Sequence, residues 1–176
     1  MFTKMKKQSR VPSSETALQR AFENCEKQGR FKAVESTSFS DYLLRAQKDL
    51  SSAERDLQGG DYHWARIKGY QALFHALNAL LVKKKGFFSK DHGCVLVALI
   101  KNEIITEELV SQLHLLMSSV LKQVTAQTIY DDIDEFRIQR NFALYKPKAW
   151  EEVKKEDVAR ELEKIQKNIA ILVVLL

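Results

Sequence analysis

The stretch ARIKGYQALFHALNALLVKKKG, residues 65–86, decides the fold class of this 176-residue chain. It contains no proline, it ends at a glycine, and its apolar residues recur at helical spacing. We therefore predict a helix that Asp61 caps and that runs to Lys85, just before Gly86. One face carries small residues, which let another helix approach closely, and the opposite face carries large residues that fill space. The small residues are Ala65, Gly69, Ala72, Ala76 and Ala79, and the large ones are Tyr70, Phe74, Leu77 and Leu81.

Segments on both sides of this stretch repeat the helical pattern and indicate a bundle. Ser13 or Ser14 is the expected cap of the first helix, and Ser89 that of the helix after Gly86. No segment shows sustained strand alternation, and 6 glycines and 2 prolines are too few for a sandwich or barrel of short strands. The prediction is an all-α, up-and-down helical bundle with an extra N-terminal helix. The further helices are expected over residues 14–27, 39–57, 89–101, 106–124, 129–145 and 154–175.

The formal net charge of +5 is distributed unevenly. Residues 1–37 hold 8 basic and 4 acidic residues, whereas residues 38–176 hold 20 and 19. We therefore expect two parts: a basic tail plus accessory helix in residues 1–37, and a nearly neutral bundle in residues 38–176. This distribution does not support a diffusely basic, phosphate-binding face on the bundle.

Cys25 and Cys94 are the only cysteines, and they form neither a CxxC pair nor a cluster with zinc-site spacing. The simple interpretation is a reduced, intracellular protein, so we expect a cytoplasmic location. No apolar stretch follows the basic start, so we expect no secretory signal. The longest uncharged apolar run, residues 169–176, is shorter than the ~20 residues that span a bilayer. We expect no membrane association, no metal and no cofactor.

The segment IYDDIDEFRIQRNFALY, residues 129–145, carries the densest set of charged residues that could do chemistry. Arg137 and Arg140 lie three residues apart and so share a helix face, with Asp134 and Asp131 one and two turns before Arg137. The interpretation without a functional role is a solvent-exposed helix face, whose ion pairs each contribute ~0.2–0.5 kcal/mol to stability.

Three stretches together resemble the HEPN family, the small helical-bundle domains of prokaryotic nucleotide-binding systems. They are residues 65–86, FFSKDHGCV (residues 87–95) and RNFALYKP (residues 140–147). The first is similar to an aromatic- and alanine-rich helix of the family, the second to a Ser/Lys-His segment, and the third to the C-terminal Arg…His signature. The resemblance covers roughly residues 39–176 and implies the same bundle fold.

The resemblance also implies site residues. Arg140 matches the signature arginine, Asn141 the polar residue after it, and Tyr145 falls at the place of the signature histidine. Active members are metal-independent endoribonucleases that work as dimers, with the arginine steadying phosphate charge. An unperturbed tyrosine, with a pKa of ≈ 10, is a poor replacement for histidine as a base. The sequence resembles a subgroup that carries tyrosine there, although that subgroup's Ala-Asp-Tyr is Ala143-Leu144-Tyr145 here.

Arg137, His63, Arg66 and His92 are weaker candidates for ligand binding. His63 and Arg66 lie near the start of the helix over residues 61–85, and His92 matches the Ser/Lys-His segment. Polar residues near helix starts can meet anions, although capping or packing is the plainer role. Two further histidines, His75 and His114, lie among apolar residues and are expected to pack in the core or in an interface.

The resemblance implies a homodimer and a partner, a minimal nucleotidyltransferase, as in toxin–antitoxin pairs. In some pairs that enzyme adenylylates a tyrosine near the signature, for which Tyr145 is the candidate. RNA-directed activity at an Arg-Asn site in a dimer cleft is the leading hypothesis. The alternatives are a non-catalytic dimer that binds a nucleotide, RNA or a protein, and a bundle that serves only as a scaffold.

Overall fold

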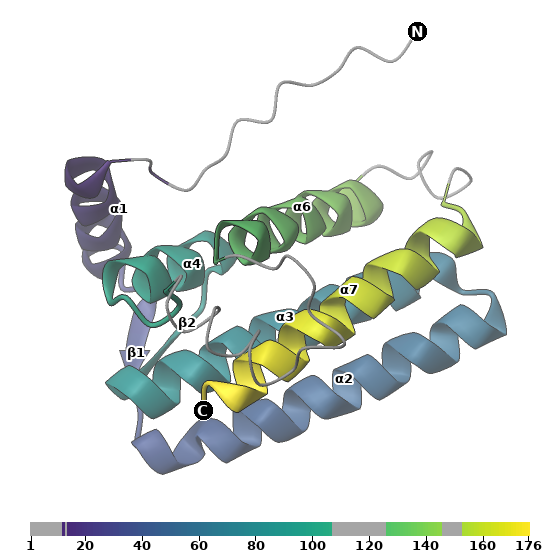
Figure 1. Cartoon of the computed structure of the whole chain (residues 1–176), viewed down its shortest axis with the longest axis horizontal. Coiled ribbons are helices and arrows are strands. Elements are labelled where there is room, and N and C mark those ends of the chain that lie inside the picture. The colour runs from purple at the N-terminus through teal and green to yellow at the C-terminus, as the bar shows by residue number, and fades with distance from the viewer. Residues whose placement is uncertain (1–11, 13, 107–125, 146–152) are drawn as a thin grey trace, which may run out of the picture.

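A computed structural model describes residues 12, 14–106, 126–145 and 153–176 of the chain (Figure 1). It confirms the all-α bundle with an extra N-terminal helix, and most of the expected helix bounds hold within two or three residues. The expected helix over 106–124 falls almost entirely outside the described residues. The helices are α1 (Glu15–Lys27), α2 (Phe39–Gly59), α3 (Tyr62–Lys85), α4 (His92–Lys101), α6 (Ala126–Tyr145) and α7 (Lys155–Val174).

Helix α3 is the centre of the bundle and packs against α2, α4, α6 and α7 (Figure 1). Its small-residue and large-residue faces are therefore both largely covered. Gly69 shows why small residues are needed, because a Cβ atom there would clash with the side chain of Leu162 on α7. Gly60, with φ of +89°, adopts the left-handed conformation that ends α2 and lets α3 turn back along it.

Two short strands, β1 (Phe31–Ala33) and β2 (Phe87–Ser89), were not expected from the sequence. They pair antiparallel, with Phe31 opposite Ser89 and Ala33 opposite Phe87. Three residues are too few to show strand alternation, so the pattern of the chain could not reveal them. The ladder joins the segment after α1 to the segment before α4.

The expectation of reduced cysteines is wrong: Cys25 of α1 and Cys94 of α4 form a disulfide, with their Cα atoms 5.9 Å apart. The two residues are 69 positions apart in the sequence, and only the packing of α1 on α4 brings them within bonding distance. The argument for an intracellular location from reduced cysteines is therefore lost, and the cytoplasmic location stays a prediction.

Ser89 does not cap α4, as the sequence suggested; Asp91 does. The Asp91 carboxylate accepts hydrogen bonds from the backbone N–H groups of Gly93 and Cys94, at 2.8 and 3.0 Å. Ser89 is buried at the end of β2, where its N–H donates to the side chain of Asn78 on α3 and its hydroxyl donates to the Asp91 carbonyl. Ser89 thus stabilises the turn that precedes the helix, two residues before the capping Asp91.

None of the described helices is both long and apolar enough to cross a membrane.

Candidate functional site

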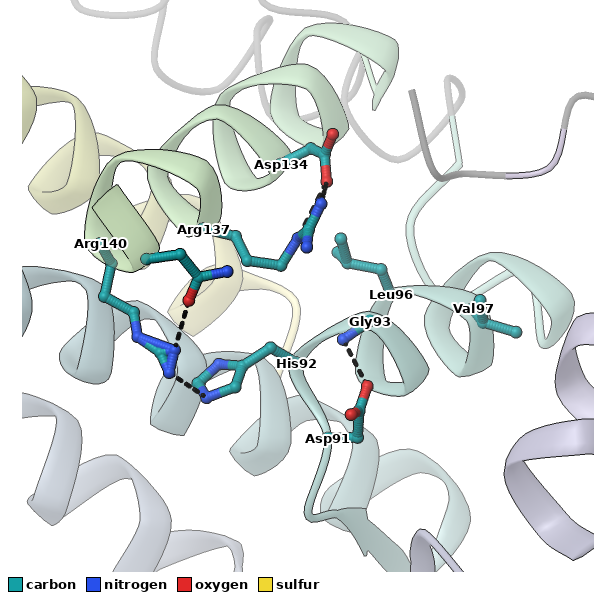
Figure 2. Close-up of a pocket in the computed structure, with 9 residues that line it drawn as sticks. Asp91, His92, Gly93, Leu96, Val97, Asp134, Arg137 and Arg140 are labelled. Atoms are coloured by element: carbon teal, nitrogen blue, oxygen red, sulfur yellow. Dashed lines mark hydrogen bonds and ion pairs between the residues drawn. The ribbon is translucent and has the colours of Figure 1, made fainter. Parts of the chain in front are cut away.

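A cavity of about 240 Å³ lies between the first turn of α4 and the last half of α6 (Figure 2). Helix α6 supplies the polar wall, because Asp134, Arg137 and Arg140 recur every three residues on one face. Helix α4 supplies its N-terminal turn and two apolar side chains. The lining residues are Asp91, His92, Gly93, Leu96, Val97, Asp134, Arg137, Arg140 and Asn141.

The side chains that contact the Arg140 guanidinium directly are neutral. Its Nη1 donates to Oδ1 of Asn141 at 3.0 Å. Its Nη2 lies 3.5 Å from Nε2 of His92 (Figure 2). Its Cζ lies 5.5 Å from the ring centre of Tyr70. Its Nε is buried and has no hydrogen-bond partner among the described residues. The guanidinium is therefore a partly buried cation that is held by dipoles and a π-face and is not neutralised.

Arg137 differs from Arg140, although both line the cavity as their spacing predicted. Its Nε donates to Oδ1 of Asp134 at 3.0 Å, and its Nη2 donates to the same oxygen. Both side chains are nearly buried, at 10% and 12% exposure. The expected intrahelical ion pair is thus present, but it faces the cavity and not the solvent, so Arg137 brings little net charge to the site.

His92 reaches Arg140 from the opposite wall. Its ring packs against two aromatic side chains of α3 in tilted contacts, with centroid distances of 3.9 Å to Phe74 and 5.0 Å to Tyr70. Burial, with the neighbouring Arg140 guanidinium next, lowers the pKa of His92 to about 4, so the ring is neutral at pH 7. Because arginine only donates, Nε2 is the accepting nitrogen and the proton lies on Nδ1. Nδ1 is buried and lacks a hydrogen-bond partner within the described ranges.

Two carboxylates line the cavity, and each already accepts hydrogen bonds. Asp91 caps α4, and Asp134 is paired with Arg137. Across the described part of the chain, no group of three or more His, Cys, Asp or Glu side chains is arranged to hold a metal ion. The chemistry on offer is that of an anion site.

Arg66 and His63 do not line this cavity. Arg66 pairs with Glu161 on α7 through two hydrogen bonds of 2.7 and 2.8 Å, so it fastens α3 to α7. His63 is buried at the start of α3, where burial lowers its pKa, and it lines a shallower hollow. Tyr145 is the last residue of α6, and its side chain lies outside the described residues. His114 lies outside them as well.

The fold and the site define a class of protein: an all-α bundle with an arginine-bearing cleft between two helices. The chain belongs to the HEPN family, since the HEPN domain matches residues 39–173. The match begins at the first residue of α2, so α1 and β1 precede it. Membership supports a nucleotide-binding or RNase-type module, and HEPN domains commonly form dimers. No curated protein matches the chain.

Sequence reasoning missed how these residues meet. It placed Arg140, Asn141 and His92 as separate candidates, and it assigned Tyr70 and Phe74 to space filling. The contact between Arg140 and His92 spans 48 positions of sequence. A partial signal was present, because Tyr70 and Phe74 are four residues apart and so lie on one face of α3, as an aromatic platform requires.

Proposed function

We propose that this chain binds phosphate groups of RNA or of a nucleotide at Arg140 and Asn141, as the HEPN member of a pair with a minimal nucleotidyltransferase. The observation that carries the proposal is the uncompensated charge of Arg140. The two buried arginines of the described part of the chain, Arg66 and Arg137, each pair with a carboxylate, whereas the partly buried Arg140 pairs with none. A cation withdrawn from water without an anion is costly, and a phosphate at the cavity would remove that cost.

The donors of the cleft suit a phosphate. The guanidinium fork matches the geometry of phosphate oxygens, and its charge roughly doubles the strength of each hydrogen bond. The side-chain oxygen of Asn141 accepts a hydrogen bond from Arg140, and its two amide hydrogens remain to be donated to a ligand. Bulk charge is not required, in agreement with the nearly neutral bundle.

Cleavage of RNA would also require a group that takes the proton of the ribose 2′-hydroxyl. Tyr145 stands at the signature position, and we assign the chain to the HEPN subgroup with tyrosine there. His92 is neutral at pH 7, but with a pKa of about 4 it is a weak base. These two observations favour a second candidate function, a dimeric module that binds RNA or a nucleotide without turnover.

The Arg140→Ala variant tests the phosphate site. We expect it to weaken binding of a short single-stranded oligoribonucleotide by about tenfold or more, because a charge-assisted hydrogen bond contributes ~1.5–3 kcal/mol. Fluorescence anisotropy at several salt concentrations gives the affinity, and gel analysis of the same samples reports cleavage. Arg160→Ala removes the same charge from an exposed pair on α7 and is the matched control. Equal affinities of wild type and Arg140→Ala, or no binding by either, would exclude the site.

Tyr145 is the proposed acceptor of an adenylyl group from the nucleotidyltransferase, by analogy with other pairs of the family. Tyr145 is the last residue of α6, five residues or about one and a half turns after Arg140. Incubation with ATP and the partner enzyme should add one AMP to the wild type and none to Tyr145→Phe, as measured by intact mass. Modification of both proteins would show that another residue is the acceptor.

We also propose a homodimer. Membership of the HEPN family supports it, since HEPN domains commonly form dimers.

A further inference from the structure

The segment that precedes the HEPN match is attached to one wall of the cleft. Cys25 of α1 is bonded to Cys94, in the first turn of α4. Next to that bond, β1 pairs with β2, and the Lys90 N–H donates to the Arg30 carbonyl at 2.9 Å. All of these links fall on residues 87–94, which include His92.

The same short segment is also fixed from the side of α3. The amide of Asn78 bonds both backbone groups of Ser89, at 2.8 and 3.2 Å, and Ser89 in turn bonds Asp91. Asp91 caps the first turn of α4 through Gly93 and Cys94. His92 therefore lies between a hydrogen-bonded turn and a covalent bond, and both hold it on the side of Arg140.

Helix α1 depends on the disulfide more than the rest of the fold does. Cys25 is its one buried residue, and among the described elements its main packing partner is α4. Phe22 adds a ring contact with Phe31 at 5.0 Å. An element with so little buried surface detaches at a low free-energy cost once its covalent link is broken.

We propose that the Cys25–Cys94 disulfide is a redox latch on the Arg140 site: while closed it holds the first turn of α4, and with it His92, against Arg140, and its reduction releases α1 and loosens that wall. The effect on ligand binding rests on the proposed function; the effect on His92 does not.

The chemistry needs only a dithiol as reductant. One thiolate of the dithiol attacks a sulfur of the disulfide, the S–S bond breaks, and the second thiolate then closes the dithiol to its own disulfide. Cys25 and Cys94 gain two electrons and two protons and become thiols. If the protein works in a reducing compartment, as the predicted cytoplasmic location implies, a disulfide there is typically transient or redox-sensing.

His92 itself reports on the latch. Arg140, Asp91, Arg137 and His75 are the charged or titratable groups that act on it, and burial has the largest effect. We expect NMR titration of the oxidised protein to give a His92 pKa of about 4. After reduction with dithiothreitol, water reaches the ring and the pKa rises by about one unit or more towards the ordinary value near 6.5.

The controls lie in the same spectrum. His63 is on α3, which the disulfide does not tie, and it is not among the groups that act on His92, so its pKa should stay unchanged. Cys25→Ser should show the reduced-state pKa of His92 with or without dithiothreitol. A His92 pKa that stays near 4 in folded, reduced protein would overturn the proposal. So would loss of the dispersed spectrum on reduction, because the disulfide would then hold the whole bundle and not one wall of the cleft.

The oligoribonucleotide probe separates this inference from the proposed function. Both hold if reduction weakens its binding about fivefold or more while the His92 pKa rises. If the pKa rises but the probe binds neither form, the latch stands and the proposed function fails. If the probe binds both forms equally, the link between latch and ligand is wrong.

Discussion

Removing the Cys25–Cys94 disulfide is expected to lower the free energy of unfolding by about 2–4 kcal/mol. The bond joins residues 69 positions apart, and closing a loop of this length restricts the unfolded chain strongly. The chain-entropy relation gives roughly 4 kcal/mol for such a loop, and residual structure in the unfolded chain reduces that figure. Urea titrations of the wild type, with and without dithiothreitol, and of Cys25→Ser measure the loss.

The loss should leave a folded protein, because single domains have ~5–15 kcal/mol of stability. Cys25→Ser must also become insensitive to dithiothreitol, which separates the disulfide from other effects of the reductant. Identical midpoints for oxidised and reduced wild type would show that the bond contributes nothing to stability.

Breaking the ion pair between Arg66 and Glu161 should have an effect of similar size. Their side chains are only 9% and 19% exposed, so Arg66→Met leaves a largely buried carboxylate without a cation. We expect a loss of about 3 kcal/mol at pH 7, whereas Arg66→Met/Glu161→Leu should recover most of it by packing two apolar side chains. Arg160→Met, in a pair that is 74% and 45% exposed, should change stability by no more than about 0.5 kcal/mol.

The pH dependence of the Arg66→Met variant checks the cause. Burial already raises the pKa of Glu161, and the hydrogen bonds from Arg66 oppose that rise. Without Arg66 the folded-state pKa rises further above the unfolded value. The stability from protonated Glu161 is then complete below the unfolded pKa and is lost as pH rises through the folded one. The deficit of the variant should shrink towards pH 4, near the ordinary value for glutamate. A deficit independent of pH would point to lost packing.

The same double variant addresses Arg66 as a ligand contact, which the sequence suggested. If Arg66→Met/Glu161→Leu binds the oligoribonucleotide as the wild type does, Arg66 has only its structural role between α3 and α7. The comparison is cleaner than a single substitution, since it leaves no unpaired buried charge behind.

The sequence was sufficient to predict those features that interactions between nearby residues determine. The apolar residues of α7 recur at helical spacing. Helix α3 ends at Gly86, whose φ of +70° suits a residue without a Cβ atom. The pair of Asp134 and Arg137 follows from three-residue spacing on one helix. These features depend only on residues that are close in sequence, so the amino-acid sequence is enough to predict them.

Local reasoning failed where two capping candidates compete. Ser89 and Asp91 both suit the start of α4, and the choice between them depends on Asn78, eleven positions earlier, which draws Ser89 into the buried turn. The two strands were not predicted for a related reason: each is only three residues long and is stabilised by pairing with the other.

By itself the sequence determined the class of fold and the HEPN relationship, and it singled out Arg140, which the structure places in the wall of the cavity. These conclusions rest on helical periodicity, capping residues and the order of motifs. All three are properties of the linear chain, so they can be recognised without a structure. Only the tertiary structure decided that Arg66 and Arg137 are neutralised while Arg140 is not, that His92 packs beside it, and that Cys25 bonds Cys94. Each of these depends on distances between residues far apart in sequence, since charge, burial and bonding are set by whatever the packing of helices brings within a few ångströms.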